Sequence, residues 1–150
     1  MGVLHNVMPL DAEMRDWLEA ESVAYPPSSF GRSATPREIK AAVSDLQGFT
    51  AEFNGGDTFS EVDIHTPSTE GPWTQLVITS RQGLDDPADF YFAKGWPEAI
   101  IPVLINLSRF TGPLVLIEDS GMTAVVITPS ETVASIMSKW AFTNESASDA

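Results

Sequence analysis

The feature that most constrains the fold is a predicted helix over residues 96–111, whose apolar residues leave little polar surface on any side. These residues are Ile100, Ile101, Val103, Leu104, Ile105, Leu107 and Phe110. A helix that is apolar all round has to be buried, so we expect it to be the central cover of a sheet. Pro102 lies inside it and predicts either a kink or a start delayed to the following turn.

The strands for this sheet are predicted by short segments of alternating or continuous apolar residues, each bounded by turn residues. They are residues 49–53, 59–66, 73–80, 88–94, 114–117 and 123–128. The short links between the first four favour an antiparallel meander, and residues 118–121 join the last two as a hairpin. The sequence therefore predicts an α+β fold with a largely antiparallel sheet of about six strands, covered by helices.

Three further helices are expected. Residues 11–21 are amphipathic, and Thr35, Pro36 and Glu38 form a capping box with proline at the first helical position, before a helix that Gly48 ends. Residues 128–131 repeat the capping arrangement before a last helix that places Trp140 in the core, as the first helix places Trp17. We expect one domain over residues 1–142, a loop at 22–34 and a disordered acidic tail at 143–150.

The charge balance limits the partners of this domain. Asp and Glu outnumber Lys and Arg by 21 to 8, for a formal net charge of -13. Nucleic acid is a poor partner because phosphate binding needs a basic surface, whereas a protein with a basic surface would be attracted. The alternative is that the negative charge serves solubility alone.

The location we expect is cytoplasmic. The sequence has no cysteine, which suits a reducing compartment. Residues 1–8 show no Lys or Arg before an apolar run, and the longest apolar stretch, residues 99–105, is far below the ~20 residues of a membrane span. We therefore expect no secretory signal and no membrane association.

No catalytic constellation is recognisable. Glu61, Asp63 and His65 project from one face of a predicted strand, but alternation with Val62 and Ile64 is typical of the solvated face of an antiparallel sheet. Serine nucleophile motifs and phosphate-binding loops are missing from the sequence, and His5 falls in what we interpret as a mobile terminus. We therefore expect no metal, no cofactor and no enzyme activity.

The candidate partner-binding residues are acidic turns and two tryptophans. Asp85, Asp86 and Asp89 do not fit the spacing of a calcium loop, so a solvated loop or a protein contact is the better interpretation. Glu118 and Asp119 form a second acidic turn. Trp73 and Trp96 border turns and are candidates for an interaction hot spot, although we favour a core position for both.

Residues 90–98, 107–108 and 112–121, about a third of the chain, resemble small acidic bacterial proteins of the toxin-immunity type. This resemblance implies a cytoplasmic domain that binds and blocks one toxin domain. The order of elements is also similar to secretion-chaperone folds, which implies an adaptor acting as a homodimer. We expect a non-enzymatic protein-binding module of the immunity type, with the adaptor as the first alternative and a metal-dependent enzyme as the second.

Overall fold

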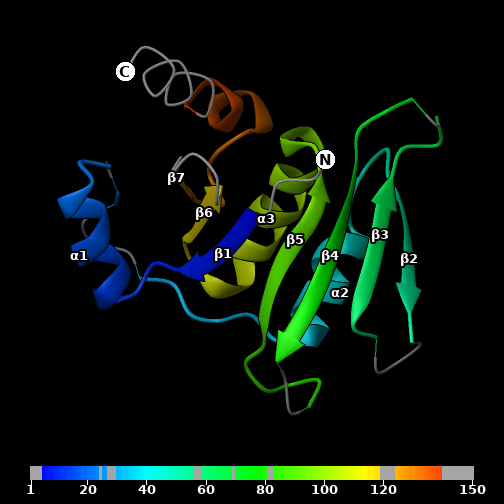
Figure 1. Cartoon of the computed structure of the whole chain (residues 1–150), viewed down its shortest axis with the longest axis horizontal. Helices are drawn as coiled ribbons and strands as arrows, with labels where there is room; N and C mark the ends of the chain where they lie inside the picture. The colour runs from blue at the N-terminus through cyan, green and yellow to red at the C-terminus, as the bar shows by residue number, and fades with distance from the viewer. Residues whose placement is uncertain are drawn as a thin grey trace.

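The computed structural model describes residues 5–23, 25–26, 30–55, 59–68, 70–80, 83–118 and 124–139, and its sheet has seven antiparallel strands in the order β2-β3-β4-β5-β1-β6-β7 (Figure 1). The strands are β1 (His5–Pro9), β2 (Thr50–Asn54), β3 (Glu61–His65), β4 (Trp73–Ser80), β5 (Asp89–Gly95), β6 (Leu114–Glu118) and β7 (Ala124–Ile127). The predicted α+β class is confirmed, as are the meander β2 to β5 and the hairpin β6–β7.

The strand that the sequence did not predict is β1, at the centre of the sheet. It pairs with β5 on one side and β6 on the other, and places His5 opposite both Phe92 and Glu118. His5 and Val7 are buried, while Asn6 and Met8, which alternate with them, are exposed. The expectation of a mobile terminus around His5 was therefore wrong. A segment of five residues that ends in a proline is too short to reveal alternation. Pairing with strands on both sides stabilises β1 as a strand, which its local sequence does not do alone.

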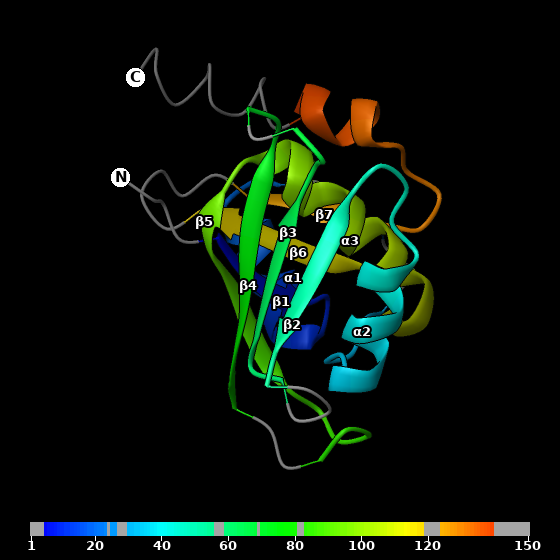
Figure 2. The ribbon, with the colours of Figure 1, turned by 90° about the vertical axis from the view of Figure 1, so that its right-hand side faces the viewer.

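Two helices cover the inner face of the sheet, α2 (Pro36–Ser44) and α3 (Pro97–Thr111), as the edge-on view shows (Figure 2). Buried side chains of both helices join one core with Val62, Leu76 and Phe92 of the strands. The central, buried position expected for α3 is confirmed. A start delayed by Pro102 was wrong, because the helix begins at Pro97 and runs through it.

The opposite face is covered only in part. Helix α1 (Ala12–Ala20), capped by the Asp11 side chain, packs Leu18 into a second cluster with Val115 of β6 and Val126 of β7. Trp17 is half-buried against this cluster. Helix α1 lies to one side of the sheet in Figure 1, so none of the described helices covers the outer side of β2 to β5.

One of the two predicted helix caps is confirmed, and the other lies at a different residue. Thr35 and Glu38 form the complete capping box of α2, whereas the last helix begins at residue 133 and is capped by Thr132, later than predicted. Gly48 does have a left-handed backbone, but α2 has already ended at Ser44. Trp140 and the tail at 143–150 lie outside the described residues. Among the described helices, none has the length and apolar character needed to cross a membrane.

Candidate functional site

We call the uncovered outer side of β2 to β5 the open face. Its position follows from the register, which pairs Glu52 with Asp63, Asp63 with Gln75 and His65 with Trp73 across neighbouring strands. The side chains between these residues, such as Val62 and Leu76, are buried on the inner face. The open face includes Thr50, Glu52, Asn54, Glu61, Asp63, His65, Trp73, Gln75, Val77, Thr79, Asp89 and Tyr91.

Hydrogen bonds across the strands fix the polar groups at the centre of the open face. Asp63 accepts from the Asn54 amide at 3.0 Å and from the Gln75 amide at 3.2 Å, which links three strands through one carboxylate. His65 Nδ1 lies 2.9 Å from the Thr66 carbonyl oxygen; because that oxygen can only accept, Nδ1 carries the hydrogen. Nε2 of the same ring lies 4.0 Å from Glu52 Oε1.

The predicted solvated face of β3 is confirmed, since Glu61 is exposed and Asp63 and His65 are half-buried while Val62 and Ile64 are buried. Within the part of the chain that the structure describes, no three His, Asp or Glu side chains lie close enough to hold a metal ion. The polar groups of β3 instead bond to their neighbours on β2 and β4 and to the backbone.

The described Lys and Arg side chains are distributed unequally between the strands and the rest of the chain. The open face carries Glu52, Glu61, Asp63 and Asp89. The described basic side chains lie instead on the helices or on the loop before α2: Arg15, Arg32, Arg37, Lys40, Arg109 and Lys139. The one Lys or Arg in β2 to β5 is Lys94, whose side chain is outside the described part. The described side chains of the open face therefore include no Lys or Arg.

Trp73 and Trp96 lie together at one end of β4 and β5. The backbone N–H of Trp96 donates to the carbonyl oxygen of Trp73 at 3.0 Å. Trp73 is 41% exposed and Trp96 is 45% exposed. The core position that we favoured for both was wrong. Trp73 opens β4 on its outer side, and Trp96 precedes the first turn of α3, so neither reaches the inner core. Two exposed tryptophans side by side are typical of an interaction hot spot.

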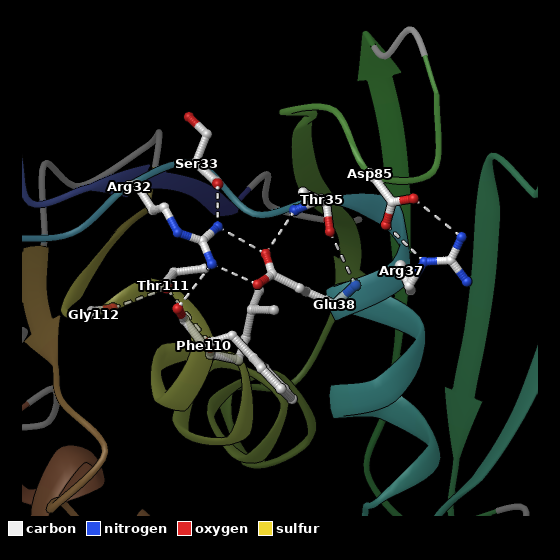
Figure 3. Close-up of polar contacts among 10 residues, drawn as sticks. Arg32, Ser33, Thr35, Arg37, Glu38, Asp85, Phe110, Thr111 and Gly112 are labelled. Atoms are coloured by element: carbon white, nitrogen blue, oxygen red, sulfur yellow. Dashed lines mark hydrogen bonds and ion pairs between the residues drawn. The ribbon is translucent and has the colours of Figure 1, made fainter.

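The first acidic turn is attached to α2 rather than free in solvent. Arg37 donates from Nε and from a terminal nitrogen to the two oxygens of Asp85, at 2.7 and 3.2 Å (Figure 3). Its backbone N–H also donates to the Leu84 carbonyl oxygen. The hydrogen bond and charge of Arg37 hold the pKa of Asp85 below its ordinary value. Asp86 and Asp89 are exposed, so they, not Asp85, supply uncompensated charge near this turn.

The structure does not bring the two predicted acidic turns together. Strands β5 and β6 run in the same direction because both are antiparallel to β1. Asp85 and Asp86 precede β5, whereas Glu118 ends β6, so the two turns lie at opposite ends of the sheet. Glu118 is half-buried opposite His5, and Asp119 lies outside the described residues.

Sequence reasoning missed Arg32, which lies in the loop before α2. Its terminal nitrogens donate to both oxygens of Glu38, at 2.8 and 2.6 Å, and to the carbonyl oxygens of Ser33 and Phe110 (Figure 3). One guanidinium thus ties the start of α2 to the end of α3. These bonds lower the pKa of Glu38 and raise that of Arg32. The spacing of Arg32 from the capping glutamate is the only sequence signal, and it does not reveal the contact with Phe110, 78 positions away.

The fold and this surface define a class of protein: a single α+β domain with one half of its antiparallel sheet left open, acidic and bordered by exposed tryptophans. Comparison with protein-family models, with curated proteins and with solved structures found no match.

Proposed function

We propose that this chain is a non-enzymatic, cytoplasmic protein-binding module of the immunity type, whose open face receives the basic surface of a protein such as a toxin. The observation that carries the proposal is that the uncovered sheet face has four acidic residues and no described Lys or Arg side chain. A basic partner is attracted to this face, which speeds and orients its encounter.

The tryptophan pair supports the same surface. Charge alone mainly speeds association, while large aromatic side chains that become desolvated supply most of the affinity in an interface. Trp73 belongs to the open face and Trp96 adjoins it. The acidic residues that speed association and the tryptophans that supply affinity therefore lie on one side of the molecule. A partner lying along β3 and β4 would contact the acids of β3 and the exposed tryptophans at one end of these strands.

The adaptor alternative predicts a different kind of partner. A secretion adaptor would bind a protein that is exported, whereas an immunity protein would bind and inhibit a toxin. Inhibition of the captured partner's toxicity separates the two, because only the immunity function requires it.

The test is quantitative capture of the partner from a lysate of the source cells. The triple variant Glu52→Gln/Glu61→Gln/Asp89→Asn removes three charges from the open face without changing side-chain size. Its matched control, Glu13→Gln/Asp16→Asn/Glu21→Gln, removes three exposed charges from α1 and the residue after it. We expect the first variant to lose capture and the control to retain it.

With the captured partner purified, binding kinetics across a salt series complete the test. Salt shortens the screening length from ~10 Å at 0.1 M to ~3 Å at 1 M, so association should slow while dissociation changes little. Trp73→Ala and Trp96→Ala should each weaken binding by about 2 kcal/mol or more, mostly through faster dissociation. Equal loss in both triple variants, or an association rate independent of salt, would contradict the proposed surface.

A further inference from the structure

Helices α2 and α3 lie on the side of the sheet opposite the open face (Figure 2). Residues of both helices line a groove. It has a volume of about 380 Å³ and is lined by Ala41, Ala42, Asp45, Asn106, Arg109 and Phe110, among others. Asn106 donates to the Ala42 carbonyl oxygen at 3.1 Å, which holds the helices together beneath it. The α2 wall is therefore formed by small side chains, while Phe110 at the rim is 48% exposed.

The groove contains one charge of each sign without an internal partner. Arg109 is exposed, and among the described basic side chains it alone has neither an ion pair nor a stacked aromatic ring. Asp45 follows the last residue of α2, and no described basic group lies within ion-pair distance of it. Arg109 and Asp45 line the same groove but do not meet each other.

We propose that this chain forms a two-fold symmetric dimer through the α2–α3 groove, with the Arg109 of each protomer pairing with the partner's Asp45. A two-fold axis brings a surface against itself, so the surface has to be complementary to itself. One unpaired cation, Arg109, and one unpaired anion, Asp45, meet this condition, because two-fold symmetry produces two identical ion pairs, one on each side of the axis. The exposed Phe110 of each protomer then lies over the small residues of the partner's groove.

The charges also disfavour other occupants. A basic protein would be repelled by Arg109, and an acidic one by Asp45. A second copy matches both charges. The Arg32 contact with Glu38 and with the Phe110 carbonyl oxygen fixes the relation of α2 to α3, so the groove has a defined shape before it meets another protomer.

Such a dimer leaves both open faces accessible, because the groove and the open face lie on opposite sides of the sheet. Dimerisation and partner binding are therefore independent, and one dimer could hold two partner molecules. The test of the dimer requires no partner.

Sedimentation equilibrium at about 0.1 mM protein and ~0.15 M NaCl, where the screening length is ~8 Å, measures the mass. We expect wild type to have the mass of a dimer, and Asp45→Arg and Arg109→Asp each to have half that mass, since each variant puts like charges opposite one another. An equimolar mixture of these two variants should restore the dimer, because every contact then joins opposite charges. The chain with both substitutions should also dimerise.

Glu61→Arg is the matched control, since it makes the same charge change on the open face and should remain dimeric. Circular dichroism and thermal unfolding show whether each variant is folded. Monomeric wild type overturns the proposal. Dimers in both single variants would assign the interface to another surface, and a mixture that stays monomeric would refute the crosswise pairing.

Discussion

At the scale of single residues, Arg32 shows how one side chain in an aperiodic loop can connect two helices. Its guanidinium is half exposed, and its partner Glu38 is largely shielded from solvent. Bidentate geometry makes this pair stronger than an ordinary surface ion pair, but solvent screening still limits its contribution to about 0.5 to 1 kcal/mol. Glu38 has a second function, because its side chain also accepts from the Thr35 backbone in the capping box.

The variant Glu38→Gln separates the two functions, since glutamine preserves the capping box and removes the charge. The pKa of Glu38 is lowered in the folded protein, so its contribution is present above the unfolded value of about 4.3 and is lost as pH falls through the folded value. We expect the variant to be less stable than wild type by about 0.5 to 1 kcal/mol at pH 7, with the difference vanishing once pH falls below the folded pKa of Glu38.

Urea unfolding at a series of pH values measures this difference. Glu13→Gln on α1 is the control, because Glu13 is exposed and forms no ion pair with any described residue. Its stability should differ from wild type by less than about 0.5 kcal/mol throughout. A Glu38→Gln difference that is constant with pH would mean that the Arg32 pair does not stabilise the fold.

At the scale of elements, α3 is the helix on which the inner core depends. Leu104 has no exposed surface, so Leu104→Ala should cost about 2 to 5 kcal/mol, through lost burial and the cavity that remains. Met8→Ala is the matched control, because it truncates a large apolar side chain that is 42% exposed on β1. Chemical denaturation of both variants gives the comparison. Similar small losses in the two would show that α3 is not a core element.

Helices and hairpins were predictable where the sequence pattern that specifies them spans only a few residues. The capping box at Thr35, the apolar pattern of α3 and the glycine-rich turn after Asn54 each act over a few residues, and each predicted its element. Strand β1 was missed because it is stabilised by pairing with β5 and β6, over 80 residues away along the chain. No local pattern in five residues contains that information.

The candidate surface was predictable only in part, for a related reason. Alternation along β3 placed Glu61, Asp63 and His65 on one solvated face, as the structure does. Whether Trp73 and Trp96 are exposed depends on where α1, α2 and α3 end on the sheet, which is a tertiary property. The attachment of Asp85 to Arg37 likewise joins residues 48 positions apart. The remaining assignment of partner-binding residues stays a prediction.

At the scale of the whole molecule, the net charge of -13 opposes folding by repulsion within the compact state. Raising NaCl from ~0.01 M to ~0.15 M shortens the screening length from ~30 Å to ~8 Å. We expect the melting temperature to rise over this range, because repulsion among the excess acids outweighs the loss at a few surface ion pairs. The α1 variant Glu13→Gln/Asp16→Asn/Glu21→Gln should show a smaller rise. A melting temperature that falls with salt would show that the ion pairs dominate instead.

The central place of β1 also determines the order in which the sheet can be completed during synthesis. The strands β2 to β5 pair with neighbours in sequence and can assemble as soon as they leave the ribosome. Strand β1 is made first, but its partner β6 ends only at Glu118. The first strand must therefore wait until most of the chain has emerged, exposing its backbone edges in the meantime. The pairing of β1 with β6 thus forms only after the β2 to β5 meander has been made.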